Sequence, residues 1–366
     1  SGTGAVSIGG NITTTNDNIS FAKAVTLAGN IALNTGSGAG TITFNSTLDA
    51  TTAHSETLSL TAGSGNINFV GAVGSSKALG AITIVSVADI TTSSTLKMSS
   101  LTQSAGTGTT TFSDTVTANA AGGLNLTGTA FTLNGAVDTS TAAAGGTVTV
   151  ANSGLLTIGS NKNMSLDGAF TQSGTGAVSI AGNITTTNDH ISFAKAVTLA
   201  GNTALNTGSG AGTITFNSTL DATTANSETL SLTAGSGNIN FMGAVGSSKA
   251  LGAITIVSVA DMTTSSTLKM SSLTQSAGTG TTTFSDTVTA NAAGGLNLTG
   301  TAFTLNGTVD TLTAAVGGTV TIANAGLLTI GSNKNMSLDG AFTQSGTGAV
   351  SIAGNITTTN DHISFA

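Results

Sequence analysis

The sequence contains no cysteine, proline, tryptophan, tyrosine or arginine, and only 6% of its 366 residues are charged. The lack of cysteine excludes disulfide bonds, thiolate catalysis and cysteine-type zinc sites together. The low charge is unusual, because ordinary soluble domains carry about 25% charged residues. The lysines are dispersed, so we expect no nucleic-acid partner, since such binding requires clustered cations that displace counterions. No apolar run approaches the ~20 residues that span a bilayer, so we expect no membrane insertion.

What the chain does contain is small and apolar. Glycine is abundant at 50 residues, and hydrophobic residues make up 39% of the chain. Valine, isoleucine, leucine and phenylalanine are spread evenly along the sequence. This composition is too apolar, and too regularly so, for a disordered low-complexity linker.

A long internal repeat dominates the sequence. Residues 173–344 repeat residues 1–172 almost letter for letter, and residues 345–366 begin a third copy. We therefore expect a tandem array of 1–172, 173–344 and the start of a third unit, forming one continuous structure without linkers and excerpted from something longer. The first two copies differ at positions 9, 18, 31, 54, 70, 90, 136, 140, 144, 150 and 153 of the first copy.

Within each unit, apolar and polar residues alternate in short runs. Examples are Thr41–Phe44, Ala81–Val87 and Gly146–Val150. Such period-two alternation predicts half-buried strands. A second regularity is a glycine followed, two and four residues later, by residues expected to point inward. We interpret these glycines as corners that use positive φ angles. They are Gly4, Gly40, Gly65, Gly80, Gly108, Gly122 and Gly146.

These patterns predict an all-β fold, a parallel β-helix or β-solenoid with roughly 20 residues per coil. Coils would stack at about 4.8 Å, with eight or nine coils in each 172-residue unit. The absence of proline fits, because proline cannot donate to a strand ladder. Asparagines at corners, such as Asn30, Asn34 and Asn45, are predicted to stack as amide ladders. An array of β-sandwich domains is the alternative, although no linker marks a domain boundary.

Several segments resemble the repeat regions of filamentous-haemagglutinin-type bacterial surface proteins. These segments are Gly36–Ala50, Gly63–Val73 and Gly2–Asp17, all rich in glycine, serine, threonine and asparagine. The resemblance implies a right-handed β-helix in a very large secreted protein, and an extracellular location on a bacterial cell surface.

No catalytic, cofactor-binding or metal-binding constellation is predicted, and we expect no enzyme. His54 is replaced by Asn226 in the second copy, and His190 replaces Asn18, so neither histidine suits catalysis or metal ligation. The loop Gly36–Gly40 lacks the lysine and the helix of a phosphate site. The acids occur singly and are expected to cap corners, with a weak calcium site as an alternative. They are Asp17, Asp49, Glu56, Asp89, Asp114, Asp138 and Asp167.

The sequence therefore favours a structural function. We expect a segment of a long extracellular fibre, as a filament, stalk, sheath or matrix component, whose partner is another copy of itself. Exposed strand edges would favour end-to-end stacking, and low charge would favour lateral packing. An adhesin module that recognises a cell-surface ligand is the alternative. An ice-binding solenoid is a further one, suggested by Thr13–Thr15, Thr109–Thr111 and the pair Thr41 and Thr43.

Overall fold

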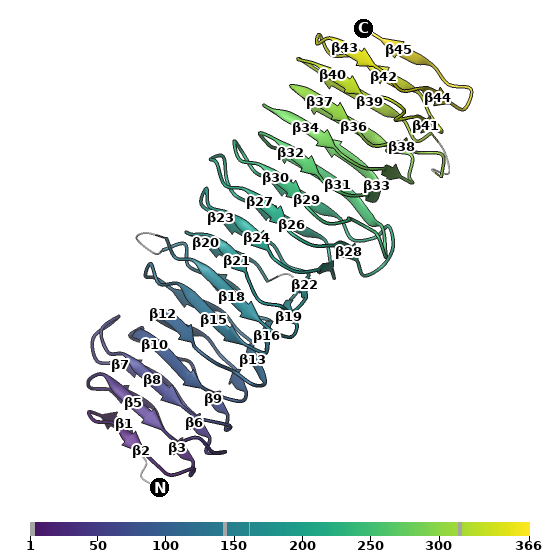
Figure 1. Ribbon diagram of the computed structural model, residues 1–366. Coiled ribbons are helices and arrows are strands. Elements are labelled where there is room, and N and C mark those ends of the chain that lie inside the picture. Colours follow the sequence, from purple (N-terminus) through teal and green to yellow (C-terminus); the bar gives the residue numbers. More distant parts are fainter. Residues whose placement is uncertain (1–3, 142–144, 161, 314–316) are drawn as a thin grey trace. The chain divides into compact units, whose positions relative to one another are not determined.

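A computed structural model describes residues 4–141, 145–160, 162–313 and 317–366. Over these residues the protein is all-β, with parallel strands stacked into a β-solenoid of about 16 turns and about 22 residues per turn (Figure 1). This confirms the predicted fold class, and the parallel pairing excludes the β-sandwich alternative. No helix in the described part of the chain is long and apolar enough to cross a membrane.

The chain divides into two compact units, Ser1–Val178 and Ser179–Ala366, and strand β22 (Val178–Ile180) lies at their boundary. Each unit is built from three parallel sheets. In the first unit, sheet 1a contains β1 (Val6–Ile8), β4 (Val25–Leu27), β7 (Leu48–Ala50), the single bridging residue Val73, the first part of β12 (Leu96–Gln103), β14 (Val116–Ala118), β17 (Val137–Asp138) and β20 (Met164–Leu166).

Sheets 1b and 1c complete the first unit. Sheet 1b contains β2 (Ile12–Thr13), β5 (Ile31–Asn34), β8 (Leu58–Thr61), β10 (Leu79–Ser86), the second part of β12, β15 (Leu124–Gly128), β18 (Val148–Asn152) and β21 (Phe170–Gln172). Sheet 1c contains β3 (Ile19–Phe21), β6 (Ile42–Phe44), β9 (Ile67–Phe69), β11 (Ile90–Thr92), β13 (Thr109–Phe112), β16 (Ala130–Leu133) and β19 (Leu156–Ile158).

The second unit has three corresponding sheets, named by their sequence equivalents in the first. Sheet 2a contains β25 (Val197–Leu199), β28 (Leu220–Ala222), the bridging residue Val245, the first part of β33 (Leu268–Gln275), β35 (Val288–Ala290), β38 (Val309–Asp310), β41 (Met336–Leu338) and β44 (Ile356–Thr358). Sheet 2b contains β23 (Ile184–Thr186), β26 (Thr203–Asn206), β29 (Leu230–Thr233), β31 (Leu251–Ser258), the second part of β33, β36 (Leu296–Gly300), β39 (Val320–Asn324), β42 (Phe342–Gln344) and β45 (Ile363–Phe365).

Sheet 2c contains β24 (Ile191–Phe193), β27 (Ile214–Phe216), β30 (Ile239–Phe241), β32 (Met262–Thr264), β34 (Thr281–Phe284), β37 (Ala302–Leu305), β40 (Leu328–Ile330) and β43 (Val350–Ile352). Most strands are three or four residues long, with buried residues flanking one outward residue. The alternation in the sequence therefore becomes an inward and an outward row on each sheet.

The inward rows form a narrow core in which like stacks on like. Phe44 lies between Phe21 and Phe69, with ring centroids 5.2 and 5.5 Å apart and nearly parallel rings. The second unit repeats this stack with Phe193, Phe216 and Phe241. Because the register places each inward residue over its counterpart in the next coil, the core is a set of side-chain ladders rather than an irregular cluster.

The glycine pattern correctly predicts the inward residues, but the reason given for the glycines was wrong. Ile42 and Phe44 after Gly40, and Ile67 and Phe69 after Gly65, are all buried. Neither glycine has a positive φ angle, however. A Cβ atom on Gly65 would lie 2.1 Å from the carbonyl oxygen of Gly40 in the preceding coil. Glycine is required there because backbones approach closely; Gly36 and Gly63, nearby in the same corners, adopt the positive φ.

The repeat does not contain a whole number of turns. Ser192 and Ser364 are the same position of the repeat, 172 residues apart. Ser192 lies on sheet 2c, where it pairs with Thr215, whereas Ser364 lies on sheet 2b, where it pairs with Thr343. In the same way, strand β23 lies on sheet 2b and its equivalent β44 lies on sheet 2a. Successive copies therefore begin one sheet apart.

The pairing of sheet 2a gives the number of turns. One repeat leads from β23 to its equivalent β44. From β23 on sheet 2b to β25 on sheet 2a the chain passes two sheets, which is two-thirds of a turn. From β25 to β44, both on sheet 2a, it makes seven full turns. One repeat therefore makes seven and two-thirds turns. The expectation of eight or nine coils was slightly too high, because some coils are long: Thr203 pairs with Leu230, 27 residues later.

Replacement of Phe44 by alanine tests the core ladder. The side chain is 1% exposed and lies between two other rings. We expect Phe44→Ala to lower the free energy of unfolding by about 3–5 kcal/mol, since neighbouring coils cannot close the cavity. The measurement is urea unfolding followed by circular dichroism. Val70→Ala, at a side chain 46% exposed, is the control and should cost less than about 0.5 kcal/mol. Equal losses for both variants would contradict the ladder.

Candidate functional site

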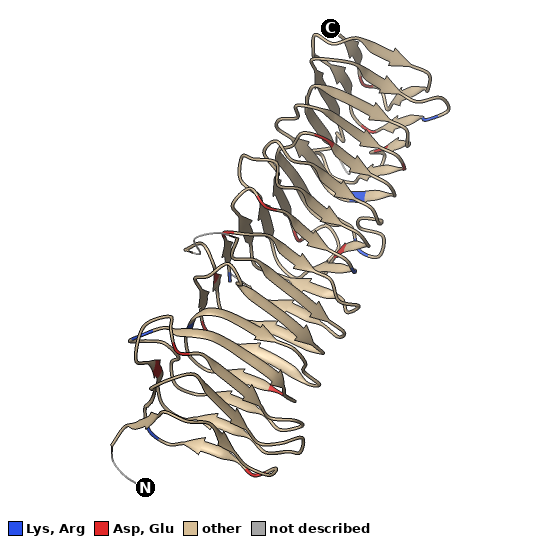
Figure 2. Ribbon diagram, turned by 60° about the vertical axis from the view of Figure 1, so that its left-hand side comes forward, with Lys and Arg blue, Asp and Glu red and all other residues tan. Residues whose placement is uncertain are grey.

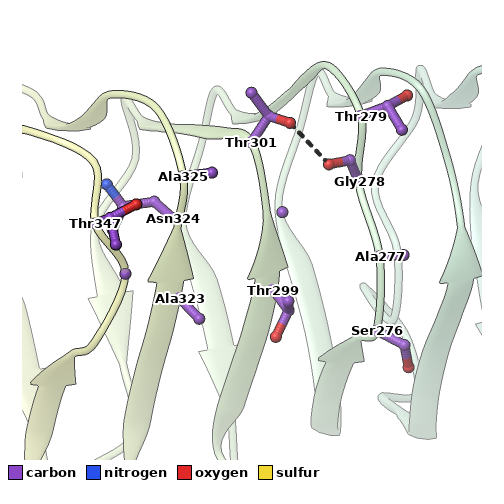
Figure 3. Close-up of a pocket in the computed structure, with 12 residues that line it drawn as sticks. Ser276, Ala277, Gly278, Thr279, Thr299, Thr301, Ala323, Asn324, Ala325 and Thr347 are labelled. Carbon is purple, nitrogen blue, oxygen red and sulfur yellow. Dashed lines mark hydrogen bonds between the residues drawn. The ribbon is translucent and has the colours of Figure 1, made fainter.

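A groove of about 410 Å³ runs along one corner of the second unit (Figure 3). It crosses the turns that follow β33, β36, β39 and β42, so four successive coils contribute to it. Thr301 Oγ1 donates a hydrogen bond to the carbonyl oxygen of Gly278 across it, at 3.1 Å. The lining is uncharged and small: Ser276, Ala277, Gly278, Thr279, Thr299, Gly300, Thr301, Ala323, Asn324, Ala325, Gly346 and Thr347.

The groove exists because its glycines cannot carry side chains. A Cβ atom on Gly346 would lie 1.9 Å from the carbonyl oxygen of Asn324. A Cβ atom on Gly300 would lie 2.9 Å from Gln275 Nε2 and 3.2 Å from the ring of Phe303. Close packing of the coils thus leaves a furrow along the corner, and the furrow needs no ligand to explain it.

The polar groups beneath the groove are already bonded to one another. Asn324 is fully buried, and its Nδ2 donates to the carbonyl oxygens of Gly326 and Ala349 at 2.6 and 3.2 Å. Its Oδ1 accepts a hydrogen bond from Gln344 Nε2 at 2.9 Å. In the first unit Gln172 donates to Asn152 in the same way, at 2.8 Å. These amides close a turn; they do not point a free group into the groove.

Sequence reasoning missed this buried amide network. It placed amide ladders at Asn30, Asn34 and Asn45, but each of these bonds a different kind of partner: Thr57 N, Gly36 N and Ser20 Oγ, respectively. The amides that bond to each other are instead Asn152 and Gln172, which end strands β18 and β21. A signal was available, because both occupy the inward phase of their alternating strands.

Of the three histidines, His54 and His190 exchange with asparagine between the first two copies, and each makes a hydrogen bond like that of the asparagine at the equivalent position. His190 Nδ1 accepts the backbone N–H of Thr213 at 3.0 Å, and Asn18 Oδ1 accepts that of Thr41 at 2.8 Å. His54 Nε2 lies 2.9 Å from Asn119 Nδ2. Its counterpart Asn226 accepts a hydrogen bond from Asn291 at the same distance.

Backbone conformation explains the exchange at residue 54. His54 and Asn226 have φ angles of 63° and 64°, in the left-handed region that asparagine and histidine tolerate better than most residues. A hollow of about 260 Å³ beside His54 also contains Lys97 and Met98. Because Asn226 takes the place of His54 in the second copy, the imidazole there acts as a turn residue with a hydrogen-bond acceptor.

Most of the predicted carboxylates cap backbone amides, as expected; for Asp17 the structure shows only a bond to its backbone oxygen. Asp49 Oδ1 accepts from Ser76 N at 2.8 Å, and Asp89 Oδ1 accepts from Thr109 N at 2.7 Å. Asp167 accepts from Gly145 N, and Glu56 from Thr52 N. Among the described residues, no group of three or more histidine, aspartate or glutamate side chains comes together at a possible metal position.

The threonine pairs that suggested ice binding do not lie on neighbouring coils. In the second copy, Thr41 and Thr43 correspond to Thr213 and Thr215, which precede and occupy β27, and Thr109 and Thr111 correspond to Thr281 and Thr283, which occupy β34. Strands β30 and β32 lie between them, with Asn240 and Thr263 at the outward position. The outer surface of sheet 2c therefore carries one continuous row of mixed threonine, serine and asparagine residues rather than a regular double row.

Comparison with known proteins adds no name to these observations: no protein-family model, curated protein or solved structure gave a significant match. The resemblance to filamentous-haemagglutinin-type repeats thus remains a hypothesis supported by sequence composition. The fold itself follows from the strand pairing of this chain.

Substitution of His190 tests its role as a corner acceptor. We expect His190→Asn to change the free energy of unfolding by less than about 0.5 kcal/mol, because the amide can accept the same N–H bond. His190→Leu leaves the Thr213 amide without its partner and should cost about 1 kcal/mol. Thermal unfolding of both variants gives the comparison. A large loss in His190→Asn would show that the imidazole has another function.

Substitution of Asn324 tests the buried amide network. We expect Asn324→Leu to cost about 1–3 kcal/mol, since it leaves the carbonyl oxygens of Gly326 and Ala349 without this donor and the buried Gln344 amide without its acceptor. Asn297→Leu, on the exposed face of β36, is the matched control and should be nearly neutral. Urea unfolding gives both values, and a neutral Asn324→Leu variant would show that the network adds no stability.

Proposed function

We propose that this chain is a structural segment of a long extracellular bacterial fibre, a filament, stalk, sheath or matrix component that associates with copies of itself. The observation that carries the proposal is the coil-on-coil architecture. Each strand pairs with the strands of the preceding and following coils in its own sheet, as β27 does with β24 and β30. Such a structure grows by adding repeats, without any new type of contact.

The side chains favour a mechanical role over a chemical one. His190, Asp49 and the buried amides of Asn324 and Gln344 bond to backbone groups or to one another at the corners. The groove in Figure 3 has neither a charged nor an aromatic lining. Polar residues in this chain therefore contribute to the stacking of coils, which is what a stiff fibre requires.

An extracellular, cell-surface location rests on the resemblance to secreted bacterial repeat proteins. The absence of cysteine is compatible with it, since a long exported chain without thiols cannot form incorrect disulfides. An adhesin module stays the alternative function, but no described residue cluster favours it. The ice-binding alternative is disfavoured by the separation of the threonine pairs described above.

Electron microscopy of the native material that contains this chain tests the proposal. We expect continuous fibres whose helical average, or whose fibre diffraction, shows a spacing near 4.8 Å along the axis. Sedimentation should show concentration-dependent association of the purified chain. Isolated particles that remain monomeric at high concentration and moderate salt would contradict the self-association.

A further inference from the structure

Two of the three outer faces of the second unit carry no charge. Along the middle of sheets 2b and 2c runs one in-register row of outward threonine, serine and asparagine residues, with one alanine. The other outward strand positions that the structure describes on these two sheets, such as Asn206, Val257 and Ala323, are also uncharged. The row on sheet 2b is Ala204, Ser231, Thr255, Thr274, Asn297, Thr321, Thr343 and Ser364. The row on sheet 2c is Ser192, Thr215, Asn240, Thr263, Thr283, Thr304, Thr329 and Ser351.

The third face collects the charges that lie on strands. Asp221, Lys269 and Asp310 all occupy the outward row of sheet 2a. Sheet 1a has the equivalent Asp49, Lys97 and Asp138. The other charged residues lie in the turns, so charged positions are few on an otherwise uncharged ribbon (Figure 2).

This division matters for association. A charged side chain that is covered by a neighbour loses its water, and this costs several kcal/mol unless a partner charge meets it. Hydroxyl groups cost less to cover and can hydrogen-bond to an opposing row. The b and c faces are therefore the ones that another molecule can cover at low cost.

The phase of the repeat moves these faces around the axis. A position on sheet 2c returns one repeat later on sheet 2b, and a position on sheet 2b returns on sheet 2a, as Ser192 and Ser364 and strands β23 and β44 show. Strand β43 is the repeat equivalent of β1, which lies on sheet 1a. In the second unit, however, β43 pairs with β40 of sheet 2c. Along one side of the solenoid, the a-type strands of one repeat are thus followed by strands of a different type from the next repeat.

We propose that successive repeats of the array are rotated by one third of a turn, and that copies of this chain pack side by side through the uncharged b and c faces. Along any one side, a charged stretch of about 37 Å then alternates with two uncharged stretches of the same length. The partner is a second copy, and this part of the proposal rests on the fibre function proposed above. The lateral contact has an axial period of three repeats.

The chemistry of the faces selects a second copy as the partner. The rows offer no cation for an acidic ligand and no carboxylate for a basic one. A matching surface must be flat, uncharged and spaced at about 4.8 Å so that its hydroxyl groups meet every row position. The b and c faces of another copy meet all three conditions, and the net charge of −7 on 366 residues leaves little repulsion to oppose contact.

Paired cysteines test the rotation, and they are unambiguous because the chain has no cysteine of its own. Thr343→Cys with Ser364→Cys should be bridged by dibromobimane, which becomes strongly fluorescent when it joins two nearby thiols. Thr329→Cys with Ser351→Cys is the positive control, since both lie on sheet 2c. Thr329→Cys with Ser364→Cys should remain unbridged. Bridging of this last pair in place of the first would show a repeat with a whole number of turns and overturn the rotation.

Added charge tests the faces. Lysine replaces threonine at both copies of one position: Thr102 and Thr274 on the b face, Thr111 and Thr283 on the c face, or Thr117 and Thr289 on the a face. All three are outward positions of consecutive strands. The b and c variants should raise the protein concentration needed for bundling by about tenfold or more, whereas the a variant should change it little. Circular dichroism verifies that each variant is folded.

The outcomes separate the two proposals. If single fibres form and all three variants bundle alike, the lateral faces are wrong and the fibre function stands. If the unsubstituted chain forms no fibres at all, both the fibre function and the lateral contact are overturned. If the a variant is the one that prevents bundling, copies associate through their charged faces and the present assignment is reversed.

Discussion

The close and regular spacing of parallel coils is the constraint on which the rest of the structure depends. At about 4.8 Å per coil, each strand residue lies over a residue of the next coil, and this decides which side chains are allowed. Phenylalanine rings fit because they stack, as Phe21, Phe44 and Phe69 do. Glycine is required where one backbone touches the next, as at Gly65 over Gly40. Buried amides fit because each can bond to its own turn and to the following coil, as Asn324 does.

The same constraint explains how corners vary without loss of structure. The position occupied by Asn18 and His190 needs an acceptor for the N–H of the following coil, and either side chain supplies it. The position occupied by His54 and Asn226 needs a left-handed backbone as well as a hydrogen-bonding group. Acids such as Asp89 fill a similar role. Residues that carry chemistry in enzymes therefore serve here as fixed acceptors between coils.

Much of this architecture could be predicted from the sequence, and the limits have physical causes. The inward residues after Gly40 and Gly65 follow from two-residue alternation, which depends only on local geometry. The true role of those glycines depends on the neighbouring coil, so it could not be seen locally. The buried pair Asn152 and Gln172 was missed because an inward amide needs a partner 20 residues away. The fractional turn was missed because coil length varies from the 19 residues between Val6 and Val25 to 27 between Thr203 and Leu230.

The fractional turn also has a consequence for the evolution of arrays of this kind. Near-identical repeats are readily gained or lost by recombination, and each event changes more than the length. One repeat more or less turns everything that follows it to a different side of the axis, whereas three together restore the original orientation. Copy number would thus determine the direction in which a distal domain faces. Variants whose copy numbers differ by a multiple of three keep this direction, and all others change it.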